Sequence, residues 1–125
     1  MGSAENLALV QSFIDTWPSL DPDRLVDFFT PDGIYHNMPM APVAGHGELR
    51  AFIAAFLANW SETSWEVVSS ATSGNMVFVE RVDRIVAHGK PVALPCCGVF
   101  EIEDGKIKVW RDYFDMGTYA RALAG

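Results

Sequence analysis

Residues 76–87 read MVFVERVDRIVA, a stretch in which charged side chains alternate with β-branched ones. As a β-strand it places Val77, Val79, Arg81, Asp83 and Ile85 on one face. The opposite face then carries Met76, Phe78, Glu80, Val82, Arg84 and Val86. If the first face is buried, the charged pair loses its hydration, which costs several kcal/mol per ion unless partners are supplied. On a solvated edge the same pair contributes about 0–1 kcal/mol. This strand alone leaves both possibilities open.

Residues 106–114, KIKVWRDYF, supply a second carboxylate in an apolar setting. Alternation predicts that Lys108, Trp110, Asp112 and Phe114 share one face, so that a carboxylate lies between two large aromatic rings. A surface strand seldom needs this arrangement. An Asp that is hydrogen-bonded by a turn near the end of the strand is the alternative explanation.

Tyr35 and Asn37 lie in a short strand expected over residues 34–38, where they point the same way. A phenol and an amide together donate and accept several hydrogen bonds, which suits the binding of a water molecule. If Arg81 held Asp83 and Asp112 in one apolar cavity, the two carboxyl groups would settle in different protonation states. One neutral acid beside one ionised base suits general acid–base catalysis, in which each role contributes roughly 10²–10⁴ in rate.

The order of the expected elements predicts an α+β fold in a single domain, residues 1–125. Apolar residues at helical spacing predict three helices in the first half of the chain, at 7–17, 21–29 and 48–60. The second helix has an Asp21 N-cap and Pro22 at its first position. Turn residues separate four later strands, expected at 64–71, 76–87, 92–102 and 106–114, before a last helix at 117–123. The sheet is expected to curl against the helices as a cone with a pocket.

Composition argues against several classes of function. The chain has 16 acidic and 9 basic residues, a formal net charge of −7, and no Lys/Arg cluster for nucleic acid. No apolar run approaches the roughly 20 residues that span a bilayer, so no membrane association is expected. The first residues show no secretory signal, and a cytoplasmic location is therefore expected.

The two cysteines, Cys96 and Cys97, are adjacent in the sequence. Their Cα atoms are about 3.8 Å apart, which is less than the roughly 4.4–6.8 Å of an ordinary disulfide. Two free thiols are therefore expected. Because the three histidines are scattered, no metal-ligand spacing is present, and we expect neither a metal nor another cofactor.

Four segments resemble the limonene-1,2-epoxide hydrolase family of the NTF2-like, or SnoaL-like, superfamily: 35–39 (YHNMP), 80–83 (ERVD), 98–100 (GVF) and 106–115 (KIKVWRDYFD). The likeness covers nearly the whole chain in the same order. It implies a cone in which a curved mixed or antiparallel sheet wraps around three helices of the N-terminal half and encloses a deep apolar pocket. It also implies a homodimer packed through the outer face of the sheet.

The resemblance further implies that a small apolar or cyclic epoxide, such as limonene oxide, is hydrolysed in one step without a cofactor or a covalent intermediate. In that reaction Asp112 is the general base that takes a proton from water, while Tyr35 and Asn37 orient the water. Asp83 is the general acid that protonates the epoxide oxygen, and Arg81 bridges the two carboxyl groups. Attack from the face opposite the departing oxygen gives a trans diol.

The matching segments also place nine side chains where the family lines its cavity, although each fits a plain hydrophobic core about equally well: Ile14, Trp17, Phe56, Trp60, Ile85, Leu94, Cys96, Phe114 and Tyr119. Trp17 and Trp60 are bulkier than expected at these positions, which leaves the pocket size open. Pro95 lies inside an expected strand, where it predicts a bulge or an edge position.

Two other classes of protein remain as alternatives. An NTF2-like isomerase or lyase, of the ketosteroid isomerase or polyketide cyclase type, also uses an Asp base in an apolar cone. It needs no second Asp bridged by an Arg, however. A non-catalytic module that binds a small molecule could share the fold, because a fold by itself does not determine a function. The presence of all five residues to which the resemblance gives a catalytic role favours the epoxide hydrolase: Tyr35, Asn37, Arg81, Asp83 and Asp112.

Overall fold

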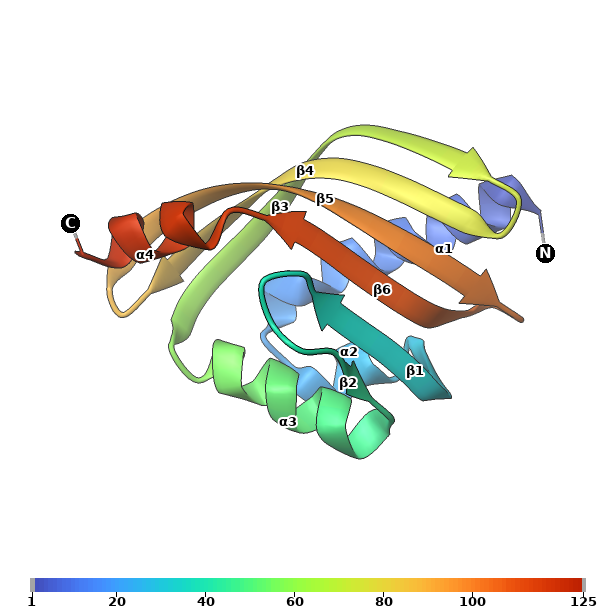
Figure 1. The fold of residues 1–125 in the computed structure, drawn as a ribbon, viewed down its shortest axis with the longest axis horizontal. Coiled ribbons are helices and arrows are strands. Elements are labelled where there is room, and N and C mark those ends of the chain that lie inside the picture. The colour runs from blue at the N-terminus through green and yellow to red at the C-terminus, as the bar shows by residue number, and fades with distance from the viewer. Residues whose placement is uncertain (1, 125) are drawn as a thin grey trace.

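The computed structural model describes residues 2–124, which form a curved six-stranded sheet with helices against it (Figure 1). The helices are α1 (Ser3–Thr16), the short 3-10 helix η1 (Trp17–Ser19), α2 (Pro22–Val26), α3 (His46–Leu57) and α4 (Met116–Ala124). The strands are β1 (Phe29–Asn37), β2 (Val43–Ala44), β3 (Trp60–Ser73), β4 (Met76–Ala87), β5 (Lys90–Glu103) and β6 (Lys106–Phe114).

The sheet is mixed, in the order β2-β1-β6-β5-β4-β3. Strands β3 to β6 form an antiparallel meander, whereas β1 lies parallel to β6. Helices α1, α2 and α3 lie on one side of the curved sheet. Helix α4 follows β6 and packs near the end of the sheet where β5 begins (Figure 1). The predicted α+β cone with helices in the first half of the chain is therefore confirmed.

Helix α2 begins as predicted, because the Asp21 side chain accepts hydrogen bonds from the backbone N–H groups of Asp23 (3.0 Å) and Arg24 (3.4 Å). Its end was predicted wrongly: the helix stops at Val26, and Phe29 already begins β1. The next four residues, expected to form a turn, lie inside β1 as an irregularity in its pairing with β6. The turn-like sequence is accommodated as an irregularity inside the strand, and Phe29, which precedes it, is buried in the core.

Two other boundaries differ from the prediction. Helix α3 begins at His46 and ends at Leu57, so Trp60 opens β3 instead of closing the helix. The short strand β2, which pairs with Ile34 and Tyr35 of β1, was not predicted. Two residues carry too little sequence pattern to be recognised as a strand, and their strand character comes from the partner.

The inward face of β4 is the one that carries Arg81 and Asp83, and all six side chains on this face, up to Ala87, are buried. The alternation predicted for β6 holds only in part. The pairing of β6 with β5 skips Lys108, so this residue points outward and forms an ion pair with Glu103 at 2.9 Å. Lys108 was predicted to share the face of Asp112, and this expectation was wrong because the bulge shifts the phase of the strand.

Pro95 causes no bulge, since it pairs with Val82 in an unbroken register between β4 and β5. Strand β6 ends at Phe114, opposite Cys96, so Pro95 lies just beyond the last pair on that side. Of the two alternatives predicted for Pro95, a bulge or an edge position, the structure shows the edge position. A proline is tolerated where β5 is paired on one side only.

The core packs aromatic rings between α1 and the sheet. Phe13 contacts the ring of Trp110 edge-on at 5.0 Å, and Trp17 stacks on Trp65 at 4.3 Å. Both cysteines are free, with Cys96 buried and Cys97 exposed, as predicted. Among the described residues, no helix is both long and apolar enough to cross a membrane.

Candidate active site

Arg81, Asp83 and Asp112 form one buried hydrogen-bonded cluster. The Arg81 guanidinium donates to Asp83 through Nε (2.8 Å) and Nη2 (3.1 Å), and to Asp112 through Nη1 (2.9 Å) and Nη2 (2.6 Å). Their exposed fractions are 1%, 4% and 4%, so this is not a solvated surface pair. The two carboxyl groups lie one on each side of the guanidinium, the arrangement that the family resemblance implies.

The strand register explains how residues from two separated strands meet. Arg81 and Asp83 are two residues apart on β4, so both point to the concave side of the sheet. Strand β5 runs between β4 and β6, with Gly98 directly opposite Asp112. Because Gly98 has no side chain, the long Arg81 side chain can pass over β5 and reach the carboxylate on β6.

Two indole rings cover the guanidinium. The Cζ atom of Arg81 lies 4.5 Å from the ring centre of Trp65 and 5.6 Å from that of Trp110. Burial opposes the charge on Arg81, but the attraction of Asp112 and Asp83 outweighs it and raises the pKa of the guanidinium well above its usual value. Arg81 therefore remains a fixed positive charge, further stabilised by cation–π contacts.

The carboxyl group of Asp83 is the member of the cluster whose protonation changes near neutral pH. Burial raises its pKa from 3.8 to about 6, although the Arg81 guanidinium acts in the opposite direction. Two carboxylates and one guanidinium would carry a net negative charge in a buried site, so one proton is readily retained. The second carboxylate, Asp112, also accepts a hydrogen bond from Nε1 of Trp110 at 3.2 Å.

Tyr35 and Asn37 lie beside Asp112 because β1 runs parallel to β6. In this register Asn37 is paired with Asp112 and Tyr35 with Trp110, on whose ring Tyr35 stacks at 4.1 Å. Burial, reinforced by the charge of Asp112, raises the pKa of Tyr35 well above its ordinary value, so the phenol keeps its proton. The buried Oδ1 atom of Asn37 has no hydrogen-bond partner among the described residues, which leaves it available to a molecule in the cavity.

A cavity of about 140 Å³ opens above the cluster, and its walls are mostly apolar. Four of the five predicted catalytic residues line it (Asp83, Asp112, Tyr35 and Asn37), while Arg81 lies behind the two carboxylates. The predicted wall residues that line it are Trp17, Phe56, Trp60, Ile85, Leu94, Phe114 and Tyr119. The apolar pocket and the polar groups therefore meet in one place.

Two of the predicted wall residues do not line the cavity. Ile14 is fully buried in the main core, and Cys96 lies beside the carboxylates. Three lining residues were not predicted: Met40, Trp65 and Met116. Trp65 pairs with Asp83 across β3 and β4, so strand alternation could have identified it. Met40 lies in the loop between β1 and β2, and Met116 is the first residue of α4, so no strand pattern pointed to either of them.

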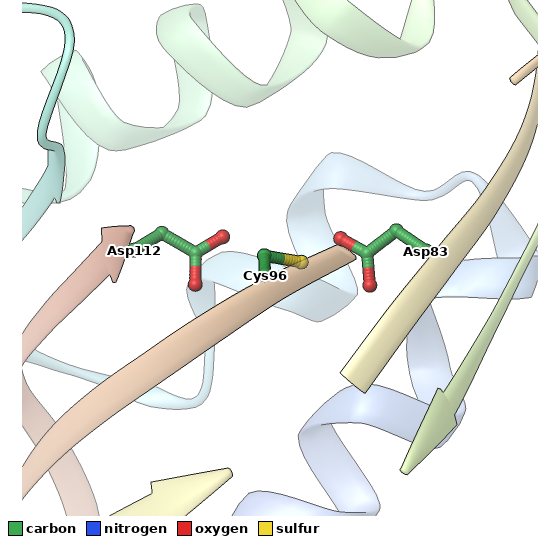
Figure 2. A group of neighbouring side chains, drawn as sticks. All are labelled: Asp83, Cys96 and Asp112. Atoms are coloured by element: carbon green, nitrogen blue, oxygen red, sulfur yellow. The ribbon is translucent and has the colours of Figure 1, made fainter. Parts of the chain in front are cut away.

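Cys96 lies on β5 between Asp112 on β6 and Asp83 on β4, as Figure 2 shows. Its Sγ atom and a carboxylate oxygen of each Asp lie within 4.8 Å of one another, which is close enough to surround a metal ion. The four carboxylate oxygens are already bonded to Arg81, however, so a cation would compete with the guanidinium. Burial raises the pKa of the Cys96 thiol, which is therefore neutral and a poor nucleophile.

Comparisons with known proteins give both a family match and related folds. Residues 10–110 match the SnoaL-like domain family. Epoxide hydrolase EphG of Mycobacterium tuberculosis is 27% identical over 114 residues, which are 91% of this chain and 76% of that protein. The structure of an LEH-like epoxide hydrolase from M. tuberculosis has a TM-score of 0.82 at 25% identity, covering 97% of this chain and 93% of the other.

A more distant solved structure shows how widely the fold is used. The epoxide hydrolase/cyclase-like enzyme SalBIII, described in pyran ring formation, has a TM-score of 0.82 at 17% identity. The match covers 92% of this chain and 94% of SalBIII. At this identity the likeness concerns the fold alone, so the chemistry has to be argued from the buried cluster.

Proposed function

This chain belongs to the family of SnoaL-like domains, and on that premise we propose that it is an epoxide hydrolase acting on small apolar or cyclic epoxides. The observation that carries the proposal is the fully buried Arg81, which holds two carboxyl groups at the base of one apolar cavity. The similarity of the chain to EphG of M. tuberculosis, and to the structure of an LEH-like epoxide hydrolase from the same organism, supports the same reaction class.

The basic half of the proposed reaction uses Asp112. A water molecule accepts a hydrogen bond from the Tyr35 phenol and donates to the free Oδ1 of Asn37 and to the Asp112 carboxylate. Asp112 takes a proton from this water as its oxygen forms a bond to an epoxide carbon. Because Asn37 and Asp112 are paired in the sheet, both groups face the same point of the cavity.

The acidic half uses Asp83. Its raised pKa keeps a proton on the carboxyl group near pH 6, and this proton passes to the epoxide oxygen as the carbon–oxygen bond breaks. Attack from the opposite face gives a trans diol. Asp112 then holds a proton taken from the water, and Asp83 has given its own proton to the diol. Net transfer of one proton from Asp112 to Asp83 restores the starting state.

An isomerase or lyase of the same fold is the second candidate function. Such an enzyme needs one Asp base, and the second buried carboxyl group would then have no role in its chemistry. A non-catalytic binding module would use neither carboxyl group as a catalyst. The Arg81 bridge to both carboxyl groups is the observation that favours the hydrolase over these alternatives.

The proposal is tested by incubating the protein with cyclohexene oxide, styrene oxide and limonene oxide and separating the products by chiral chromatography. We expect trans diols from at least one of these epoxides, with an excess of one enantiomer. If none of the epoxides gives diol above the uncatalysed rate, the hydrolase proposal is wrong.

We also propose that the chain forms a homodimer through the outer face of the sheet. Half-buried apolar side chains lie on that face, among them Phe78, Val82 and Val99, and Tyr113 is 44% exposed. Light scattering should give twice the chain mass, and Val82→Glu should give monomers because it introduces a charge in the middle of this face. A monomeric wild-type protein would contradict the proposal.

A further inference from the structure

We propose that Trp60 and Tyr119 set an upper limit on the size of the substrate. Their side chains form the wall of the cavity opposite the carboxylates. This inference rests on the proposed hydrolase function and adds a substrate class to it. The cavity takes epoxides of about the size of cyclohexene oxide and excludes those that carry further branched substituents on the ring.

The strand register gives the distance between this wall and the carboxylates. Trp60 pairs with Ala87 at the end of β4, whereas Trp65 pairs with Asp83. Four residues along a strand span about 13 Å. Trp60 therefore lies at the far end of the cavity, and Tyr119 packs against the same end of the sheet, on the apolar cluster formed around Ala87.

A hydrogen bond joins the two side chains across the wall. Nε1 of Trp60 donates to the Tyr119 hydroxyl at 3.1 Å, connecting the first residue of β3 with the C-terminal helix α4. The Trp60 ring also stacks on Phe56 at 6.0 Å and contacts Trp17 at 6.1 Å. Because the indole is held by these three contacts, it cannot turn aside without breaking at least one of them.

The volume of the cavity fits a small ring. An apolar cavity of about 150 Å³ binds one benzene molecule, and the cavity here measures about 140 Å³. Cyclohexene oxide is a six-membered ring with one added oxygen, which the Asp83 side of the cavity would receive. Limonene oxide has the same ring with a methyl and an isopropenyl group, and this extra bulk would meet Trp60 and Tyr119.

The test compares kcat/KM for limonene oxide and cyclohexene oxide in wild-type protein and variants. Wild-type protein should prefer cyclohexene oxide, and Trp60→Ala should raise the limonene-to-cyclohexene ratio about tenfold or more. Tyr119→Phe removes only the hydroxyl group and should shift the ratio in the same direction by less. Trp60→Phe replaces Trp60→Ala if the latter fails to fold. An unchanged ratio in these variants would overturn the inference.

Phe28→Ala is the matched control. Phe28 packs against the core and contacts Phe13 at 5.4 Å, but it does not line the cavity. This variant should lower stability and leave the ratio unchanged. If Phe28→Ala shifted the ratio as much as Trp60→Ala does, general loosening of the fold would explain the effect and the inference would be wrong.

A binding measurement separates this inference from the proposed function. Cyclohexanol and menthol differ by a methyl and an isopropyl group on the ring, and their binding can be followed by isothermal titration calorimetry without any turnover. Trp60→Ala should improve menthol binding relative to cyclohexanol about tenfold or more. If binding shifts but no epoxide is hydrolysed, the size limit stands and the hydrolase proposal fails. If hydrolysis occurs and neither ratio shifts, the size limit fails.

Discussion

Gly98 lies directly opposite Asp112 across β5 and β6, and a methyl group on Gly98 would come within 3.1 Å of the Asp112 carboxylate. The same methyl group would lie 2.7 Å from Nη1 of Arg81, which is too close for any real contact. Arg81 is held by hydrogen bonds to both carboxyl groups, so it cannot move aside without loss of one of them. The cluster therefore depends on a glycine in a neighbouring strand.

Gly98→Ala should consequently damage both activity and stability. We expect a loss of about 1–3 kcal/mol in the free energy of unfolding, as for other overpacked cores, and a fall of at least tenfold in kcat/KM. Urea denaturation and steady-state kinetics measure the two effects. Gly47→Ala is the matched control, because a methyl group on Gly47 meets nothing within 4 Å. Equal behaviour of the two variants would refute this role of Gly98.

Activity should fall as pH rises above about 6. The carboxyl group of Asp83 has its pKa raised to about 6 by burial, and only its protonated form can donate to the epoxide oxygen. The logarithm of kcat/KM should therefore decrease by about one for each pH unit on the alkaline side. A profile that stays level up to pH 8 would contradict the assignment of Asp83 as the acid.

The stability of the fold should also depend on pH through Asp83. Because the pKa of this carboxyl group is higher in the folded state than its usual 3.8, the folded protein binds more protons between about pH 4 and 6. The contribution of Asp83 to the free energy of unfolding should thus decline as pH rises through this range, by up to about 3 kcal/mol.

Asp83→Asn provides the reference for that measurement because it cannot titrate at this position. The difference in unfolding free energy between wild type and variant should decrease from pH 4 to 6 and then remain constant. A difference that increased over this range would mean that the fold lowers the pKa of Asp83, contrary to our account.

Replacing either carboxyl group by an amide should abolish most of the activity. Asp112→Asn removes the base and Asp83→Asn the acid, and each loss should lower kcat by roughly 10²–10⁴. Circular dichroism should remain unchanged, since Asn fills the same volume. Glu80→Gln is the control, because Glu80 precedes Arg81 on β4 but is exposed on the outer face. Substantial activity in either Asp variant would show that its role is misassigned.

Much of the site could be predicted from the sequence because β-strands alternate regularly. Arg81 and Asp83 share a face in any straight strand, and their expected burial depended only on which face of β4 is inside. The pairing of Asn37 with Asp112 was beyond prediction, because β1 and β6 are distant in the sequence and lie parallel. The family resemblance, and not the local pattern, placed these residues in one site.

The prediction failed where pairing overrides local pattern. Lys108 was expected to point inward, but a bulge opposite β5 turns it outward. The turn-like residues after Phe29 lie within β1 for a similar reason. Ile14 and Trp17 both occupy the inner side of the first helical segment, and only the packed structure shows that Trp17 reaches the cavity whereas Ile14 stays in the core.

The central claim is that water attacks the epoxide directly while Asp112 acts as a base and not as a nucleophile. A single turnover in H₂¹⁸O, with protein in excess over cyclohexene oxide, tests this most directly. Mass spectrometry of the diol and of the peptides that contain Asp83 and Asp112 locates the label. Our account predicts one ¹⁸O atom in the diol and none in either peptide. An unlabelled diol together with ¹⁸O in the Asp112 or Asp83 carboxyl group would contradict it, because it requires a covalent ester intermediate.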